Sequence, residues 1–433
     1  MLWGDLYKKK LCSPEEAVKN IKSGNRVVIG HAAAEPQILV EAMVNNHENY
    51  EAVEIVHMVP LGKCDYLNPT MEKHFRHNAL FVGGGLARNA IEEGRGDYTP
   101  SFFFEIPKLF KNNILPVDVA LVQVSKPDKQ GYCSLGVSID YTKSAVENAK
   151  TVIAQVNDQM PRTHGDSFVH ISQIDYIVEA SQPLHEIPLP VIGEIESRIG
   201  EYCASLIDDG STLQLGIGAI PDAVLSFLKV KNDLGIHSEM FSDGILDLVE
   251  NGNINNTKKT LHKGKSVANF LMGSKRLYDY VDDNPAVQMY PADYVNHPMV
   301  IAQNNKMVSI NSALQIDIMG QVVAETIGYK QFSGTGGQVD FVRGASLAKE
   351  GKSIIAFPSV AAKGKISRIV PIVDEGSSIT TSRNDVDYVV TEYGIASLKG
   401  KTLKERARAL INIAHPDFRE ILHEKAKIRF RYF

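Results

Sequence analysis

One carboxylate, Glu239, stands where an apolar run gives way to a turn in the stretch DLGIHSEMFSDG at residues 233–244. Residues 234–239 have the pattern of a short strand, and residues 241–244 that of the turn after it. Ligands bind at the carboxyl ends of parallel strands, so we expect Glu239 to face a crevice. A carboxylate there can act as a general base, a metal ligand, or a nucleophile that forms an acyl-enzyme anhydride, and it can also simply cap a loop. Because no His/Asp/Cys constellation lies nearby, the metal-ligand role is the least favoured.

Two glycine-rich loops are the next candidates for chemistry. The first, at residues 216–218, lies between an expected strand at 212–215 and a helix that begins near Pro221. Backbone N–H groups there could hold a phosphate or an oxyanion, although proline replaces the last glycine of the dinucleotide-binding fingerprint. The second loop has three glycines within residues 334–337, which costs backbone entropy and favours ligand contact. Tight turns without a ligand stay open as alternatives for both loops, and a third cluster at 83–85 fits either role equally.

Other patterns carry less chemistry. His74 and His77 are three residues apart in MEKHFRH, and their basic surroundings favour a solvated helix face over a metal pair. No GxSxG elbow or catalytic Cys/His signature is present, which argues against a serine or cysteine hydrolase.

Composition sets the class of protein. At 433 residues the chain is expected to form two domains of roughly 200 residues each. A net charge of −5, with both signs mixed along the chain, argues against nucleic acid as a partner. No apolar stretch is long enough to cross a membrane. The cysteines lack CxxC spacing, so we expect neither disulfides nor zinc, and a cytoplasmic location; they are Cys12, Cys64, Cys133 and Cys203.

The elements that must position these residues alternate between helix and strand. Ser13 to Glu16 reads as a capping box at the start of a helix. Apolar, β-branched runs then recur with helix-length segments between them, which predicts a largely parallel α/β sheet. These runs are residues 26–29, 53–58, 117–124, 151–156 and 174–179.

A proline-rich stretch at residues 181–190 predicts an interdomain connection. We therefore expect one domain at 1–187 and a second at 188–433, with Glu239 and both main glycine loops in the second. RVVIGHAAAEPQILVEAM and STLQLGIGAIPDAVLSFL share the order strand, glycine, small residues, proline, helix, and their first glycines, Gly30 and Gly216, are 186 positions apart. Internal duplication and chance are equal alternatives for the origin of this similarity.

Several stretches together resemble a known family. GIGAIPDAVL, LGIHSEMFSDG, INSALQIDIMGQV, SGTGGQVDFVRGA and AAKGKISRIVP are similar to segments of the acetyl-CoA hydrolase/transferase family, in its 4-hydroxybutyrate and butyryl-CoA:acetate CoA-transferase branch. The resemblance extends over nearly the whole chain. It implies an α/β fold of two similar open domains with largely parallel sheets, of the CoA-transferase type, and a homodimer.

The resemblance also implies roles for residues. Glu239 corresponds to the catalytic glutamate, which forms a glutamyl-CoA thioester, and Asn311 to a residue that polarises the thioester carbonyl. Lys363 is similar in position to the CoA-contacting lysine of the family, and Lys365, two residues later, is the alternative for the same role. No metal and no tightly bound cofactor are implied, because CoA is a substrate. The implied CoA-binding residues are Gln214, Leu215, Gly216, Ile217, Gly218, Leu314, Gly337 and Lys363.

The implied activity is transfer of CoA between a short-chain acyl-CoA and a short-chain carboxylate. Hydrolysis is an alternative, since water that reaches the same intermediates would release free acid and CoA. A noncatalytic CoA-binding protein is a more remote alternative. Acetate, propionate, butyrate, crotonate and 4-hydroxybutyrate differ by groups worth only about 1–3 kcal/mol in a pocket, so the acyl specificity stays open.

Overall fold

The computed structural model describes residues 3–431 and 433, and the chain folds into two compact units. Unit 1 runs up to Pro188 and also contains Val267–Val295. Unit 2 contains Leu189–Ser266 and Asn296–Phe433. The division expected after residue 187 assigns the 267–295 segment to the second domain, whereas in the structure this segment belongs to unit 1.

The 267–295 segment is bonded into unit 1 at several points. Its strand β16 (Val287–Met289) pairs in parallel with β8 (His164–Gly165). The amide N–H of Ala292 donates to the carbonyl of Asp140, and the Lys111 ammonium lies 2.7 Å from the Asp293 carboxylate. These partners are distant in sequence, so local patterns carry no signal for this return of the chain.

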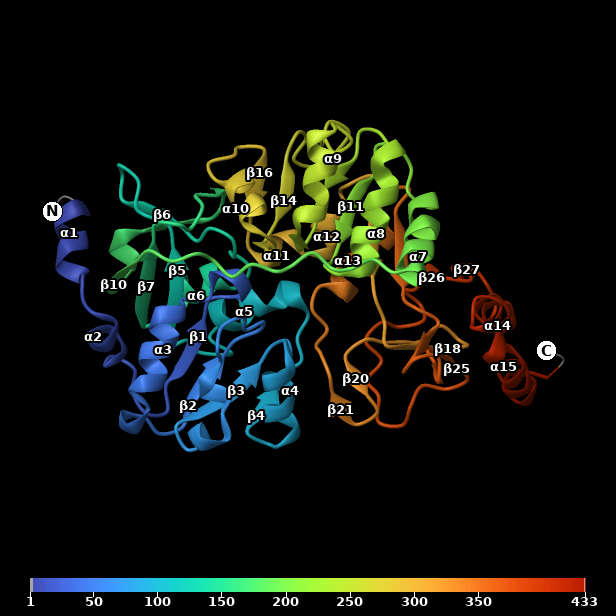
Figure 1. Cartoon of the computed structure of the whole chain (residues 1–433), viewed down its shortest axis with the longest axis horizontal. Coiled ribbons are helices and arrows are strands. Elements are labelled where there is room, and N and C mark those ends of the chain that lie inside the picture. Colours follow the sequence, from blue (N-terminus) through green and yellow to red (C-terminus); the bar gives the residue numbers. More distant parts are fainter. Residues whose placement is uncertain (1–2, 432) are drawn as a thin grey trace. The chain divides into compact units, whose positions relative to one another are not determined.

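Unit 1 is built on a seven-stranded sheet whose paired strands are all parallel. The predicted strands are confirmed with small shifts at their ends. Figure 1 shows the blue and teal strands of this sheet side by side. In spatial order they are β10 (Tyr176–Ala180), β7 (Thr151–Asn157), β5 (Val119–Val124), β1 (Arg26–Ile29), β2 (Val53–Val56), β3 (Phe75–Ala79) and β4 (Gly96–Tyr98).

The central strands of this sheet are buried on both faces. All six residues of β5 are buried, as are six of the seven residues of β7. A parallel sheet covered by helices on both faces selects such continuous apolar runs. The helices of unit 1 are α1 (Trp3–Lys10), α2 (Pro14–Val18), α3 (Gln37–Asn45), α4 (Gly85–Glu92), α5 (Ile106–Lys111), α6 (Thr142–Asn148), α10 (Lys275–Val281) and α11 (Ala292–Val295).

The capping box predicted at the start of α2 is present. The Glu16 N–H donates to Ser13 Oγ at 3.2 Å, and the Ser13 N–H donates to the Glu16 carboxylate at 3.1 Å. These two bonds satisfy backbone donors that the first turn of a helix leaves without intrahelical partners.

The helix predicted for the histidine pair is wrong. His77 lies within strand β3 and is only 2% exposed, and burial lowers its pKa to about 4. His74 precedes the strand, and its Nδ1 lies 2.8 Å from the carbonyl oxygen of Tyr50. Arg76 within β3 and Lys73 before it are exposed while Phe75 and His77 are buried, so the pattern has the period of a strand and was mistaken for that of a helix.

Unit 2 is built on a six-stranded sheet, parallel except for its last pair. The strand predicted at residues 212–215 is confirmed as β11. In spatial order the strands are β12 (Gly235–Ile236), β11 (Thr212–Leu215), β17 (Met307–Asn311), β22 (Lys352–Ala356), β26 (Tyr388–Thr391) and β27 (Gly394–Ser397).

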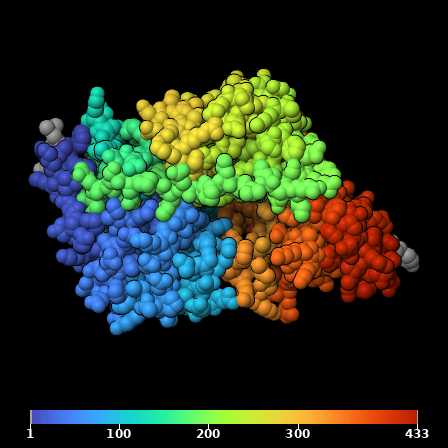
Figure 2. All heavy atoms as spheres, in the orientation of Figure 1, coloured from blue at the N-terminus to red at the C-terminus, as the bar shows by residue number. Residues whose placement is uncertain are grey.

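Helices and short hairpins complete unit 2, and its C-terminal helices pack on a core that includes Phe357, Leu410 and Leu422. Figure 2 shows the red C-terminal segment at the surface. The helices are α7 (Glu194–Ser205), α8 (Ala219–Phe227), α9 (Leu246–Glu250), α12 (Pro298–Ile301), α13 (Gln338–Leu347), α14 (Leu403–Asn412) and α15 (Pro416–Arg429).

Short strands of unit 2 lie outside its main sheet, in the region between α12 and β26. They are β18 (Gln315–Asp317), β19 (Val322–Val323), β20 (Thr326–Ile327), β21 (Lys330–Gln331), β23 (Val360–Ala361), β24 (Ile366–Ser367) and β25 (Ile369–Val370). Among the described residues, no helix is long and apolar enough to cross a membrane.

Candidate active site

Glu239 follows the edge strand of the unit 2 sheet. Strand β12 ends at Ile236, and Glu239 lies on a bend directly before the two-residue strand β13 (Met240–Phe241). The predicted strand is therefore shorter than the 234–239 run. Glu239 is half-buried, while the two residues before it are buried.

The segment before Glu239 is tied to the neighbouring strand. Ser238 Oγ donates to the carbonyl of Leu215 at 3.2 Å, next to the first glycine loop. Strand β11 also carries Gln214, whose amide forms a reciprocal pair with the amide of Asn311 at 3.2 and 3.3 Å. Asn311 is the last residue of β17, so the carboxyl ends of β12, β11 and β17 bring these side chains to one edge of the sheet.

Asn296 holds the Glu239 carboxylate. Its side-chain Nδ2 donates to Glu239 Oε2 at 2.7 Å, and the same nitrogen lies 3.5 Å from Asp340 Oδ2. Two carboxylates on one side of the amide fix its orientation, because only the nitrogen end can donate. Asn296 is fully buried and Asp340 is 1% exposed, so this orientation is set inside the protein.

Gly337 packs directly against the same carboxylate. A β-carbon at this position would overlap Glu239 Oε2 and the Asn296 amide nitrogen. Gly337 has φ −89°, a value that any residue can adopt, so the glycine is required by space and not by backbone conformation. The second glycine loop therefore brings its main chain against Glu239.

The second glycine loop also contacts the end of β17. Gln338, the first residue of α13, donates from its side-chain amide to the carbonyl of Ser312. Ser312 directly follows Asn311, and Gln338 directly follows Gly337. Hydrogen bonds and close contacts thus connect the first glycine loop, Glu239, Gly337 and Asn311 within unit 2.

A cavity of about 340 Å³ opens beside this cluster. It is lined by the first glycine loop and the start of α8, by the end of β17, and by Glu196 of α7. Gly218 is the N-cap of α8 with φ 118°, a conformation that side chains rarely adopt. The cavity lining includes the predicted residues Gly216, Ile217, Gly218 and Asn311, and also Ile220, Pro221, Ile310, Ser312 and Ala356.

Two predicted CoA contacts, Leu314 and Lys363, do not line the cavity among the described residues. Lys363 and Lys365 lie at the exposed tip of the β23–β24 hairpin, where Ala362 and Lys363 both have positive φ. Leu314 is half-buried, and its N–H donates to the carbonyl of Val323. The register between the two lysines therefore stays open.

A second acid, Asp222, follows the first glycine loop in the sequence. Asp222 is in the first turn of α8, and burial together with the nearby Asp243 carboxylate raises its pKa to about 6. Its Oδ1 is buried without a hydrogen-bond partner among the described residues. Gly244 packs against this oxygen, which would lie 2.7 Å from a β-carbon there.

Replacing Asp222 with asparagine is expected to stabilise the protein at pH 8 and to have less effect at pH 5. The folded-state pKa of about 6 exceeds the usual 3.8, so the stability contributed by Asp222 is full below pH 4 and is lost as pH rises through 6. After discounting for the partial exposure of Asp222, we expect a melting temperature about 2–4 °C higher at pH 8. An equal shift at both pH values in thermal unfolding would contradict this assignment.

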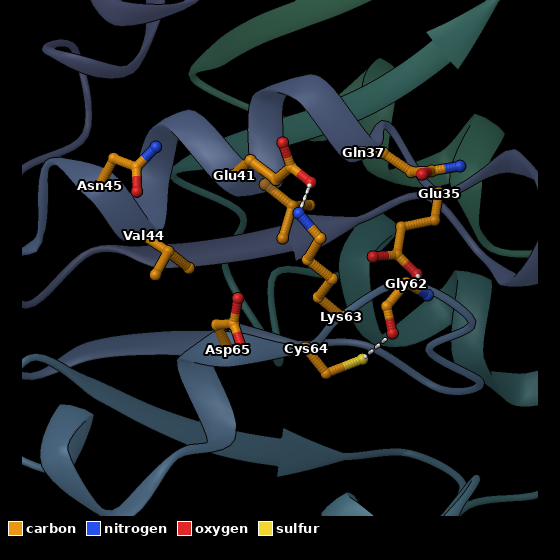
Figure 3. A pocket seen from close by; sticks show the side chains of 10 residues that line it. Glu35, Gln37, Glu41, Val44, Asn45, Gly62, Lys63, Cys64 and Asp65 are labelled. Carbon is orange, nitrogen blue, oxygen red and sulfur yellow. Dashed lines mark hydrogen bonds and ion pairs between the residues drawn. The ribbon is translucent and has the colours of Figure 1, made fainter. Parts of the chain in front are cut away.

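Unit 1 contains a separate polar cavity of about 110 Å³ (Figure 3). Glu35 at its wall is 1% exposed and accepts the backbone N–H groups of Leu61 and Gly62 at 2.9 and 2.8 Å. Burial raises the pKa of Glu35, while these two bonds oppose the shift. Gly62 leaves room for the carboxylate, because a β-carbon would overlap Glu35 Oε1. Glu35 therefore acts as a cap that fixes the loop after β2.

Sequence reasoning missed Asn296 and gave Asp340 no role. Asn296 stands in YVNHPM, which matches no motif, and its partner Glu239 is 57 residues away. Asp340 is part of the second glycine stretch, where an acid three residues after Gly337 was the available signal. Among the described residues, no cluster of three His, Cys, Asp or Glu side chains is arranged to hold a metal ion.

Comparison with known proteins identifies relatives over nearly the whole chain. Residues 4–191 match the acetyl-CoA hydrolase/transferase N-terminal domain, and residues 273–426 match the C-terminal domain of the same family. The chain is 64% identical to 4-hydroxybutyrate coenzyme A transferase of Clostridium kluyveri, covering 99% of this chain and 100% of that protein. It is 37% identical to butyryl-CoA:acetate CoA-transferase of Anaerostipes caccae, covering 99% of each.

A solved structure of a related protein has the same fold over nearly the whole chain. The crystal structure of 4-hydroxybutyrate CoA-transferase from Porphyromonas gingivalis is 48% identical, with a TM-score of 0.86 over 99% of this chain and 100% of that one. The sequence matches extend through both units, and the solved fold covers the elements that position Glu239. The chain therefore belongs to the acetyl-CoA hydrolase/transferase family.

Proposed function

We propose that this chain is a CoA-transferase that moves CoA between a short-chain acyl-CoA and a short-chain carboxylate, with 4-hydroxybutyrate or butyrate and acetate as the substrate acids. The observation that carries the proposal is the Glu239 carboxylate, bonded to Asn296 and packed against Gly337. Full-length relatives named for these two CoA-transferase activities support the choice of substrates.

Glu239 is suited to act as a nucleophile. The neutral side-chain amide of Asn296 donates to Glu239 Oε2 and so orients the carboxylate for attack. A free carboxylate is a weak nucleophile, so binding of the CoA tail must press the thioester against it. The small Gly337 allows this close approach.

The proposed reaction conserves the energy of the thioester. The Glu239 carboxylate attacks the acyl-CoA carbonyl, and CoA thiolate leaves to give an acyl-glutamyl anhydride. The thiolate then attacks the glutamyl carbonyl of the anhydride and releases the first acid. The resulting glutamyl-CoA thioester reacts with the second carboxylate to form a new mixed anhydride, and the thiolate returns to the substrate acyl carbon. This last attack frees Glu239 as the carboxylate.

The cavity at the start of α8 is the proposed CoA subsite. Ile217, Ile220 and Ile310 provide an apolar wall for the pantetheine arm. Ala219 and Ile220 carry the backbone N–H groups at the N-terminus of α8, where the helix dipole favours an anionic group of CoA. CoA is thus a substrate, and we propose no tightly bound cofactor. We also propose a cytoplasmic homodimer; the four free cysteines of the structure support a reducing compartment.

The experiment that tests the function combines the protein with butyryl-CoA and excess acetate, and in parallel 4-hydroxybutyrate with acetyl-CoA. New acyl-CoA is followed by chromatography, and free thiol by a colour reagent in the same samples. Transfer predicts new acyl-CoA without free thiol. Thiol release that does not depend on the acceptor acid would instead identify a hydrolase.

Replacing Asn311 with alanine should lower the transfer rate by about 10²–10³-fold. The Asn311 amide is the proposed donor to the oxyanion, and loss of one such donor typically has an effect of this size. Initial rates with saturating butyryl-CoA measure it. Because Gln214 pairs with Asn311, a Gln214→Ala variant shows how much of the loss comes from orientation of the amide. A loss below threefold for Asn311→Ala would remove it from the site.

A further inference from the structure

Strand β12, which precedes Glu239, is an edge strand with an outward-facing N–H and carbonyl at Ile236. The strand pairs with β11 on one side only, and the N–H groups of Gly235 and His237 donate to that neighbour. The polar groups of Ile236 alternate with these and face away from β11. In a buried position such groups need other partners.

Two side chains supply those partners where a neighbouring strand would be. Asn256 Oδ1 accepts the Ile236 N–H at 2.9 Å, and Lys259 Nζ donates to the Ile236 carbonyl at 2.6 Å. Lys259 Nζ also donates to the carbonyl of Lys265 at 2.7 Å. Asn256 and Lys259 are 6% and 3% exposed, so solvent does not compete for these bonds.

The lysine stem fits against the strand itself. A β-carbon at Gly235 would overlap Lys259 Cγ and would lie 2.8 Å from its Cδ. Gly235 therefore lets the stem lie flat on the strand and directs the amine to the Ile236 carbonyl. Asn256, with φ 58°, turns the chain so that both side chains reach the same residue.

We infer that Lys259 is a positioning residue for the proposed transferase reaction: it clamps the end of β12 and so fixes the place from which Glu239 attacks. Ile236 is three residues before Glu239, and the intervening Ser238 is bonded to the end of β11. With β12 held on both sides, the bend that carries Glu239 starts from a fixed strand end. The inference rests on the proposed function and adds a residue to it.

Burial lowers the pKa of Lys259 to about 7. Burial also lowers the pKa of the neighbouring His262, and the positive charge of Lys259 adds to that shift. A neutral amine keeps two N–H groups, which is the number of carbonyls that Lys259 serves. The clamp can therefore persist in both charge states, which accounts for a buried lysine bonded to carbonyl groups.

The test compares Lys259→Met, which keeps the stem and loses the donors, with wild type and with Lys258→Met. Lys258 is the exposed neighbour and serves as the matched control. We expect Lys259→Met to lower kcat for transfer by about 10–100-fold, since small displacements of a reacting group have effects of this order. KM for butyryl-CoA should change less than twofold, and the ratio of thiol release to transfer should rise.

A merely structural role would lower transfer and thiol release together, in proportion to the folded fraction, and leave KM and the ratio unchanged. That result would overturn the inference. Lys259→Gln, which keeps two N–H donors on a shorter arm, should fall between wild type and Lys259→Met. If Lys259→Met does not fold, a wild-type ratio in Lys259→Gln would overturn it equally.

Hydrogen exchange separates this inference from the proposed function. In Lys259→Met the peptide covering residues 234–241 should exchange faster than in wild type, while Lys258→Met should match wild type. Unchanged exchange would contradict the clamp whatever the activity. Absence of transfer in the wild-type enzyme would instead contradict the proposed function and leave the exchange result to decide the clamp.

Discussion

Replacing Glu239 with glutamine should lower CoA transfer by at least about 10⁴-fold, because an amide cannot form the anhydride and loss of a covalent nucleophile has effects of this order. Glutamine has nearly the same volume, and its carbonyl oxygen can still accept the Asn296 N–H. We therefore expect unchanged folding and CoA affinity within threefold of wild type. Single-turnover transfer assays and CoA titration measure the two quantities.

Glu239→Asp separates transfer from hydrolysis. Its shorter arm retracts the carboxylate and leaves space for water, so we expect residual activity to shift toward slow thiol release. Glu239→Gln provides the matched background without a nucleophile. If the Glu239→Gln enzyme retained more than one tenth of the wild-type transfer rate, Glu239 would not be the nucleophile. The anhydride scheme would then have to be abandoned.

Part of the candidate active site was predictable, because sequence patterns mark the ends of strands. Gln214 lies in the strand predicted at residues 212–215 and the first glycine loop follows it, so a parallel sheet places both at its carboxyl edge. Asn311, the last residue of β17, was assigned to the site only through the family resemblance. The three glycines of residues 334–337 predicted a close approach of the backbone to a ligand, and the structure places Gly337 against the Glu239 carboxylate. The sequence pattern does not predict which atom lies next to each glycine, because that depends on tertiary packing.

The remaining features depend on partners far apart in the chain. Asn296 acquires its role from one hydrogen bond to Glu239, and an isolated asparagine has no local signature. Lys259 looks like a surface lysine in NTKKTLHKGK, although it is 3% exposed. The return of residues 267–295 to unit 1 is likewise set by pairing with distant segments. Such features follow from tertiary contacts, whereas strand ends follow from periodicity.

Replacing Gly337 with alanine should lower kcat by about 10²–10³-fold, a loss exceeded only by that of Glu239→Gln and equal to that expected for Asn311→Ala. The new methyl group would overlap Glu239 Oε2 and the Asn296 amide, so the carboxylate must move away from its donor. Displacement of a reacting group by about 1 Å can cost 10²-fold, and disturbed oxyanion contacts add to it. Since φ is −89°, backbone strain does not contribute.

Two glycine-to-alanine variants make this measurement specific. Gly4→Ala, where nothing lies within 4 Å of the new β-carbon, controls for the substitution itself. Gly216→Ala also has open space around it but lines the proposed CoA subsite, so it should raise KM more than it lowers kcat. Steady-state rates against butyryl-CoA concentration resolve the two parameters. A Gly337→Ala enzyme with kcat within fivefold of wild type would mean that Glu239 tolerates displacement, which is incompatible with attack from one fixed position.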